Sequence, residues 1–486
     1  MGKTVTMLLV LFFLTASSIV TPLPVKAEPK TIVVPDDFPT IQKAVNHASA
    51  GDTVFVRAGT YFINDSNLIN LEKPVSVIGE NPYDTIIVQQ PTSYYHETIK
   101  ADAANITISG FTFKNFNVAI DVGYSYASGA VPNCYITGNR FIDGQEAINV
   151  EDAVNYTITN NYFSNNAHWA ISAATILMPS GGTIVDNTIV GNGQASVGYG
   201  GGIDFWGASY TVVANNTFSN GIYGLFMSFS HNIDIIGNNI TDNQETGIVF
   251  GAFCNNMTVY GNDIARNKIG LAQELFRIDG MGFVVQPGNI VYGNNFVDNG
   301  QQVLSYVPTG DNITDIIAWD NGKIGNYWSD YQTKYPNATE IDNSGIGDAP
   351  YVINWQNVDR YPLMESYTTI PPEISLLSPL SQKYNESSVS LVFLLDKSVN
   401  WAGYSLDGEQ NVTITGNTTL TGLSSGVHNV TVYANDTYGN MGASETGTFT
   451  VAVPEPFPTV PVAAASVTVV AVVIAGLLVY FKKRKR

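Results

Sequence analysis

The sequence predicts an all-β protein built on a single-stranded parallel β-helix, a coil of short strands whose turns stack on one another. A six-residue motif recurs seven times between residues 108 and 296, with an apolar residue at each end and Asn at its fourth position. Where no loop intervenes the copies are 22 residues apart, as from Phe141 to Phe163. A second apolar segment follows most copies after seven or eight residues. Because a repeat this short cannot bury its own apolar face, its copies must stack.

The asparagines of the motif are interpreted as structural. Short β-branched segments separated by Gly and Asn are typical of strands and turns rather than helices. Amide side chains at one corner of every turn can hydrogen-bond along the stack, which is favoured over a catalytic role. The seven motif asparagines are Asn139, Asn161, Asn187, Asn216, Asn238, Asn262 and Asn294.

Both ends of the chain predict export and anchoring. Residues 1–27 have Lys3, an apolar stretch and small residues near Ala27, as a secretory signal peptide does. Residues 462–481 lack any charge and are long enough to cross a bilayer, and the basic residues 482–486 follow at once, which predicts a cytoplasmic tail. Thirteen Asn-x-Ser/Thr sequons agree with an exported glycoprotein at the cell surface.

The net charge excludes one class of partner. The whole chain has a formal charge of −19, and removing the seven basic residues of the terminal segments lowers it to −26. Nucleic acid is therefore an improbable ligand. Solubility explains such acidity, and so does binding of divalent cations.

Changes of pattern divide the rest of the chain. A helix with Pro39 at its start is expected in residues 28–62, where it would close the open end of the β-helix. The β-helix itself is expected over residues 63–365. A small immunoglobulin-like β-sandwich is expected over residues 366–453, with strands at 389–395, 401–406, 412–415, 427–434 and 447–451, before a Pro-rich spacer at 454–461.

The two cysteines are predicted to be free and buried. Cys134 and Cys254 precede copies of the motif that are five turns apart, so they should lie about 24 Å apart along the axis. A disulfide requires Cα atoms within about 7 Å.

Several motifs carry a family resemblance. Residues 34–45 (VPDDFPTIQKAV), residues 50–61 (AGDTVFVRAGTY) and the Asn-rich turns resemble the right-handed parallel β-helix proteins of the pectin-lyase-like superfamily. The nearest resemblance is to the carbohydrate-binding and sugar-hydrolysis repeat family that includes NosD, a periplasmic copper-processing accessory protein. Three motifs are specific to that branch: GNYWSDY at 325–331, GIGDAPY at 345–351 and DRYPL at 359–363. The resemblance covers residues 32–363.

The C-terminal part resembles other surface proteins. Residues 401–408 (WAGYSLDG) and 432–440 (VYANDTYGN) are similar to immunoglobulin-like stalk modules of archaeal surface proteins. The tail from residue 454 resembles archaeal sorting signals that a sortase-like transpeptidase exchanges for a lipid, but Pro456 interrupts the pattern. A retained transmembrane helix is equally compatible with it.

The resemblance implies two activities that the residues can be tested against. Copper delivery needs gathered soft or imidazole ligands, whereas the Met and His residues here are scattered. A lyase or hydrolase of the pectin-lyase type would use acids on the outer face of one sheet. Alternation points Ile120 and Val122 inward and Asp121 outward.

The outward column of Asp121 supplies the catalytic candidates. It continues as Asn149, Ser172 and Asp204, with Glu151 and Trp206 two positions further along their strands. Asp121 and Asp204 are three turns apart, roughly 14 Å, whereas Asp121 and Glu151 are expected near 8 Å, within the range of about 5 to 9.5 Å that paired glycosidase carboxyls span.

Insertions at particular corners extend the same surface. They fall at residues 123–130, 174–181, 193–201 and 273–287, and insertions of this kind often build the binding face of a solenoid. Aromatic and acidic residues in them suit sugars, although a solvated acidic loop set with scattered aromatics is the favoured explanation. The resulting carbohydrate-binding candidates are Tyr124, Tyr126, Trp206 and Asp279, and Arg277 is the candidate basic residue of a catalytic site.

No cofactor is certain from the sequence, and calcium is the one considered. Asp342, Asn343 and Asp348 could supply part of a weak oxygen-ligand site. Ser344 stands where relatives commonly have Asp, so a simple turn that closes the last rung is favoured.

Together these observations predict a membrane-anchored surface protein whose β-helix binds a polysaccharide or cell-envelope glycan or acts structurally. A surface polysaccharide lyase or glycoside hydrolase is the first alternative. A NosD-like copper-handling accessory protein is the second.

Overall fold

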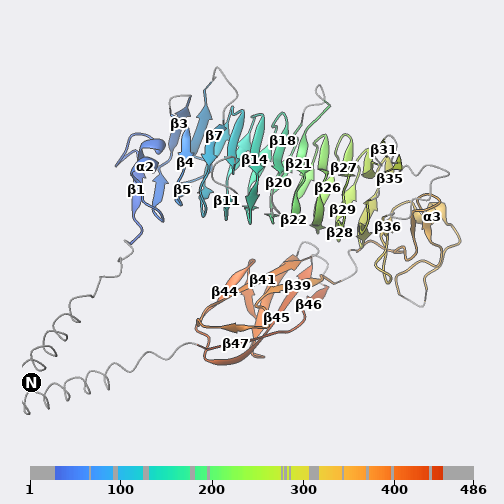
Figure 1. The fold of residues 1–486 in the computed structure, drawn as a ribbon. Coiled ribbons are helices and arrows are strands. Elements are labelled where there is room, and N and C mark those ends of the chain that lie inside the picture. Colours follow the sequence, from blue (N-terminus) through green and yellow to red (C-terminus); the bar gives the residue numbers. More distant parts are fainter. Residues whose placement is uncertain are drawn as a thin grey trace, which may run out of the picture. The chain divides into compact units, whose positions relative to one another are not determined.

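The chain divides into two compact units, residues 1–367 and residues 368–486 (Figure 1). The computed structural model describes residues 28–64, 67–90, 97–123, 131–175, 181–193, 198–274, 277–278, 282–283, 286–305, 317–341, 344–367, 371–395, 399–436 and 440–452.

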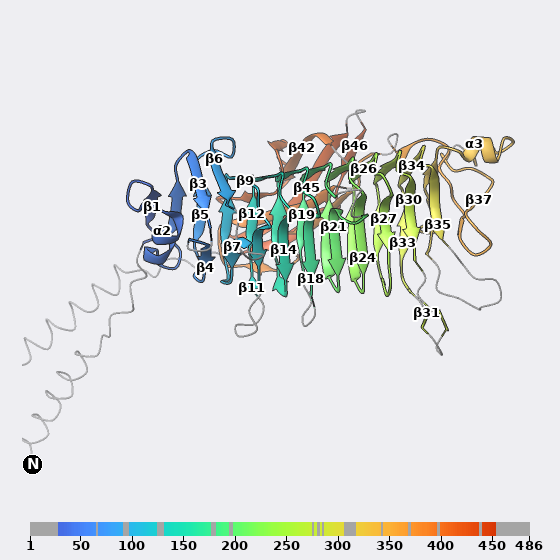
Figure 2. The ribbon, with the colours of Figure 1, turned by 90° about the horizontal axis from the view of Figure 1, so that it is seen from above.

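The first unit is a right-handed parallel β-helix, as the spacing of the motif predicts. Its rungs follow one another along a single axis, and each rung contributes one strand to each of three parallel sheets (Figure 2). The first sheet contains β1 (Thr31–Val34), β2 (Thr53–Val56), β5 (Ser76–Gly79), β8 (Thr107–Ser109), β12 (Tyr135–Thr137), β16 (Thr157–Thr159), β19 (Thr183–Val185), β22 (Ser209–Ala214), β25 (His231–Ile236), β28 (Thr258–Tyr260) and β33 (Ile290–Tyr292).

The other two sheets complete each rung. The second contains β3 (Gly59–Ile63), β6 (Thr85–Gln89), β9 (Thr112–Lys114), β13 (Arg140–Ile142), β17 (Tyr162–Ser164), β20 (Thr188–Val190), β23 (Thr217–Ser219), β26 (Asn239–Thr241), β29 (Asp263–Ala265), β34 (Asn295–Val297) and β36 (Tyr327–Trp328). The third contains β4 (Ile69–Leu71), β7 (Glu97–Ala101), β10 (Val118–Val122), β14 (Glu146–Glu151), β18 (Trp169–Ala174), β21 (Gly201–Trp206), β24 (Tyr223–Ser228), β27 (Thr246–Phe250), β30 (Ile269–Gln273) and β35 (Gln301–Ser305).

In the core of the β-helix, similar apolar side chains stack at the same register position of successive rungs. Ile136, Ile158 and Ile184 pair in register on successive strands and are at most 1% exposed. The ring of Phe141 lies parallel to that of Phe113, with centroids 5.0 Å apart, and to that of Phe163 at 4.9 Å. Each apolar side chain is therefore buried by the rungs above and below it, which is why an isolated repeat would not fold.

The motif asparagines form a hydrogen-bonded ladder, which confirms their structural interpretation. The backbone N–H of each Asn donates to the side-chain oxygen of the Asn on the next rung, as from Asn216 to Asn238 at 2.9 Å. Its Nδ2 donates to the carbonyl of Ile184 on the preceding rung at 2.8 Å. A second ladder runs along another corner through Asn166, Asn192, Asn243, Asn267 and Asn299.

The C-terminal end of the first ladder is a buried carboxylate. Asn326, the last asparagine, donates its backbone N–H to Oδ2 of Asp359 at 2.7 Å. The indole of Trp328 donates to the same oxygen at 2.9 Å. Burial raises the pKa of Asp359 to about 6, although these hydrogen bonds oppose the rise.

The N-terminal end is closed by the predicted helix, α2 (Ile41–His47). Thr40 caps it by accepting from the backbone N–H of Lys43 at 3.3 Å. Ile41 and Val45 are buried in the core of the β-helix, and the helix packs against β1, β2 and β4. At the other end the short α3 (Tyr331–Lys334) and the hairpin of β37 (Tyr351–Val352) and β38 (Val358–Asp359) follow the last rung.

The second unit has its own apolar core and consists of short strands in two sheets. One sheet contains β39 (Ile374–Ser378), β41 (Val389–Leu395) and β44 (Thr418–Leu420), and the other contains β40 (Lys383–Tyr384), β47 (Gly447–Val451), β45 (Gly426–Asp436), β42 (Val399–Leu406), β43 (Val412–Ile414) and β46 (Met441–Ala443). The five strands predicted from the sequence are present, within one or two residues at their ends.

Cys134 and Cys254 are both free and buried, as predicted. Among the residues that the structure describes, no helix is long and apolar enough to cross a membrane. The predicted signal peptide at 1–27 and the predicted membrane segment at 462–481 lie outside those residues.

Candidate functional site

The outer surface of the third sheet carries the predicted column. Asp121 on β10, Asn149 on β14, Ser172 on β18 and Asp204 on β21 are in register, each opposite the next. The alternation inferred from Ile120 therefore holds through four rungs.

Asp121 and Glu151 are linked through one amide. Nδ2 of Asn149 donates to Oδ1 of Asp121 at 2.8 Å and to Oε1 of Glu151 at 3.3 Å. Because both oxygens accept from one nitrogen, they can be no more than about 6 Å apart. The structure thus brings the two carboxyls of the predicted pair together, closer than the roughly 8 Å expected from the register, and their catalytic role stays a prediction.

Asp121 has a strongly perturbed ionisation. Its residue is 8% exposed, and burial raises its pKa to about 7. The hydrogen bond from Asn149 and the charge of Lys100 oppose this rise, whereas the negative charges of Glu97 and Glu151 add to it. At neutral pH a substantial fraction of this carboxyl therefore retains its proton and can donate it.

A second acidic pair lies further along the same surface. Burial raises the pKa of Asp204 to about 6, opposed by the hydroxyl of Tyr199, which donates to its Oδ2 at 3.3 Å. Burial also raises the pKa of Glu146, opposed by a hydrogen bond from Ser172 and reinforced by the charge of Asp204. We call Asp121, Glu146, Glu151 and Asp204, with Asn149 and Ser172 between them, the acidic face.

Aromatic side chains border the acidic face on one side. The indole of Trp169 lies 5.4 Å from the ring of Tyr199 and 6.2 Å from that of Tyr223, measured between centroids. Phe226 follows Asp204 in the same column and lies 5.7 Å from Tyr223. Aromatic rings beside carboxyls and amides offer a sugar both an apolar surface and hydrogen-bond partners.

The structure describes only some of the site residues predicted from the sequence. It brings Asp121, Glu151, Asp204 and Trp206 onto one face. Tyr124, Tyr126, Asp279 and the side chain of Arg277 lie outside the described residues, so their predicted roles stay predictions.

Sequence reasoning missed Glu146, Trp169 and Tyr223, which occupy one register position on three rungs. Strict alternation from Ile148 would point Glu146 inward. Ala147 and Ile148 are instead both fully buried, so the alternation breaks at the start of the strand. The Ala or Gly that precedes the inward Ile or Leu in each of these rungs is the signal that could have revealed it.

Asp348, the described member of the predicted calcium site, serves a turn. Its Oδ1 accepts from the backbone N–H of Thr339 at 2.9 Å and its Oδ2 from the Thr339 hydroxyl at 2.8 Å. Asp342 and Asn343 lie outside the described residues. These contacts agree with the favoured interpretation of a turn that closes the last rung.

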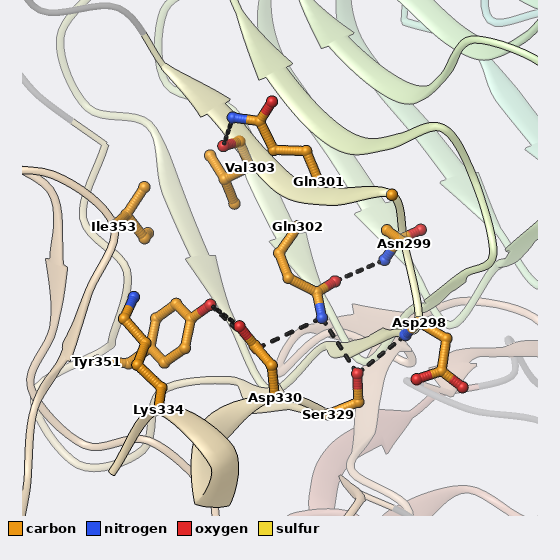
Figure 3. Close-up of a pocket in the computed structure, with 11 residues that line it drawn as sticks. Asp298, Asn299, Gln301, Gln302, Val303, Ser329, Asp330, Lys334, Tyr351 and Ile353 are labelled. Atoms are coloured by element: carbon orange, nitrogen blue, oxygen red, sulfur yellow. Dashed lines mark hydrogen bonds between the residues drawn. The ribbon is translucent and has the colours of Figure 1, made fainter.

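A cavity of about 430 Å³ lies elsewhere, between β35 and the segment around α3 (Figure 3). The hydroxyl of Tyr351 donates to Asp330 at 2.9 Å, and Gln302 donates to the same carboxylate at 3.5 Å. The ammonium of Lys334 lies 4.0 Å from the centroid of the Tyr351 ring, and Trp328 stacks on that ring at 4.2 Å. These contacts join the last rung to the C-terminal hairpin, and we assign them a structural role.

The fold and the acidic face together define a parallel β-helix protein with an acidic and aromatic outer surface. Residues 83–275 and 200–333 match the family described as "Periplasmic copper-binding protein (NosD)". These matches jointly span just over half of the 486 residues. The chain belongs to the NosD family. None of the curated proteins matches it.

Solved structures with the same general architecture are only distantly similar. They include ORF18 of Geobacillus virus E2 (12% identity, TM-score 0.39, covering 79% of this chain and 73% of that chain). An alginate lyase from Paenibacillus sp. str. FPU-7 (15%, 0.38, 57% and 99%) and the periplasmic alginate epimerase AlgG (13%, 0.34, 60% and 82%) are two others. Similarity at this level carries no argument about activity.

The residues described do not fit the copper site that the family description implies. Among them no three His, Cys, Asp or Glu side chains gather where they could hold a metal ion. Burial raises the pKa of the Cys134 and Cys254 thiols to about 12 each, so neither is readily available as a thiolate ligand. Their strands are five rungs apart, about 24 Å.

Proposed function

We propose that the protein binds polysaccharide on the acidic face of its β-helix. The observation that carries this proposal is the Asp121–Asn149–Glu151 hydrogen-bonded group, bordered by Tyr199 and Tyr223, which keep part of their surface in solvent and pack against the buried Trp169. Carboxylates accept hydrogen bonds from sugar hydroxyls, amides both donate and accept, and rings cover the apolar faces of sugars. A regular stack of rungs presents such groups at intervals of about 4.8 Å, which suits a chain-like ligand.

The cellular setting is part of the same proposal. The signal-like residues 1–27 and the apolar residues 462–481 support a chain held at the outer face of the membrane, with the basic end inside. The two-sheet second unit supports an immunoglobulin-like stalk between the β-helix and that anchor. The ligand would then be a polysaccharide of the surroundings or of the cell envelope.

A second candidate function, polysaccharide cleavage, is favoured by the ionisation of Asp121. A carboxyl that keeps its proton near neutral pH can act as a general acid, and Glu151 within about 6 Å could act as its partner base or nucleophile. Two close carboxyls whose environments differ are the arrangement that sugar hydrolysis requires.

Incubating the full-length protein in detergent with a polysaccharide panel, with and without calcium, separates the two candidates. Binding is measured by calorimetry and products by mass spectrometry. Fragments that carry an added water would indicate a hydrolase, and unsaturated fragments a lyase.

Asp121→Asn and Glu151→Gln test which side chains are responsible. Loss of fragments with retained binding would assign cleavage to this pair. Binding without fragments supports recognition alone, and the absence of both for every polysaccharide contradicts the proposal.

A further inference from the structure

Three bulky aromatic residues adopt a left-handed backbone conformation that, at the same two register positions of other rungs, belongs to Asn, Asp or Gly. Where the third sheet turns into the first, one register position has φ between 53° and 76° on eight rungs. Seven of the eight are Asn or Gly, which tolerate the left-handed region. The exception is Tyr210, with φ of 53°. The eight are Asn105, Asn133, Asn155, Gly181, Tyr210, Asn232, Asn256 and Gly288.

The register position three residues earlier, at the same corner, also has aromatic residues with positive φ. Asp152 and Gly207 adopt positive φ on earlier rungs, whereas the corresponding residues of later rungs are Phe229 at 55° and Phe253 at 59°. A left-handed conformation is a genuine outlier for a bulky side chain and costs folding free energy. Asn or Gly at these positions would avoid the cost.

Core packing does not explain Tyr210 and Phe229, because they are 59% and 41% exposed. Phe253 is half-buried, and the neighbouring Trp206, whose backbone conformation is ordinary, is 53% exposed. The rings of Trp206 and Phe229 lie 4.7 Å apart, and Phe229 stacks on Phe253 at 5.1 Å. We call Trp206, Tyr210, Phe229 and Phe253 the aromatic corner.

We propose that the aromatic corner binds the apolar faces of sugar rings in an uncharged polysaccharide, whose chain runs along the axis of the β-helix. Its rings lie on successive rungs, so a ligand that follows them must cross the strands. Exposed apolar surface kept at a cost in stability marks a binding site. This inference rests on the proposed function and extends it to the class of ligand.

The acidic face connects directly to the aromatic corner through β21, which carries Asp204 and Trp206 two residues apart. A glycan that touches both surfaces therefore meets several carboxyls. Lys100, the cation in register beside Asp121, already pairs with Asp102 at 3.4 Å. A uronate polymer would meet like charges at close range, which is costly, whereas a neutral hexose polymer would not.

The test uses substitutions that should improve folding while removing the rings. Tyr210→Asn and Phe229→Gly each install a residue that the same corner accepts on other rungs. We expect both to keep or raise the unfolding temperature and to weaken binding of neutral glucan, mannan or galactan oligosaccharides by about tenfold. Trp355→Ala, which removes a 57% exposed tryptophan outside the aromatic corner, should leave the affinity unchanged.

Oligogalacturonate serves as the charged counterpart and should bind at least about tenfold more weakly than the neutral oligosaccharides. Equal or tighter binding of oligogalacturonate would overturn the inference about charge. If Asp204→Asn weakens neutral-glycan binding but both aromatic-corner variants bind like the wild type, this inference fails while the proposed function stands. If the wild-type protein binds no oligosaccharide or polysaccharide, both fail.

Discussion

Replacing Asp121 by Asn should stabilise the folded protein at high pH and leave it nearly unchanged at low pH. The pKa of this carboxyl changes from 3.8 in an exposed chain to about 7 in the fold. Between these values the folded chain holds a proton that the unfolded chain has released, so stability falls as the pH rises. The raised pKa of Asp121 then lowers the free energy of unfolding by about 4 kcal/mol at pH 8 and by less than about 1 kcal/mol at pH 4.

Urea unfolding of the wild type and the Asp121→Asn variant at pH 4 and pH 8, followed by circular dichroism, measures this difference. Asn can still accept the hydrogen bond from Asn149, so the variant removes the charge and keeps the contact. Asp84→Asn, which removes a carboxyl at an exposed turn, is the matched control. A variant that is equally or more destabilised at pH 8 than at pH 4 would refute the argument that burial dominates the ionisation of Asp121.

Two further predictions concern the scaffold. Asn216→Ala removes an amide that donates to two carbonyls and joins Asn187 to Asn238, and it should destabilise the β-helix by about 2 to 4 kcal/mol in urea unfolding. Asn239→Ala, at an exposed position of β26 with ordinary strand geometry, is the control, and equal effects would contradict the ladder's importance. Cys134 and Cys254 should resist a thiol reagent in the native protein and both react after denaturation; rapid native labelling of either would show that its rung is wrongly placed.

The repeat predicted much of the scaffold because stacking allows few alternatives. A period of 22 residues with apolar residues five apart fixes which side chains point inward, and one inward residue such as Ile120 then fixes Asp121, Asn149 and Asp204. The asparagine ladder follows from the same register. The period and the register can therefore be deduced from the spacing of apolar residues along the sequence.

The side-chain contacts of the acidic face were harder to predict. Alternation places Asp121 and Glu151 on one face but does not say that Asn149 donates to both. Glu146 was missed because two consecutive residues are buried at the start of β14. Tyr199 reaches Asp204 from an insertion. The sequence shows the length of this insertion but does not predict its conformation.

The hydrogen bonds from backbone N–H to side-chain oxygen in the first ladder all run in one direction, from Phe111 at its start to Asp359 at its end. Every intermediate rung offers the same backbone donor to the next rung and the same side-chain acceptor to the preceding one, so any rung can follow any other. Only the two terminal residues are unique. Lengthening or shortening the protein by whole turns would therefore need no redesign of its ends, and duplication of a single gene segment could extend its binding surface by one rung at a time.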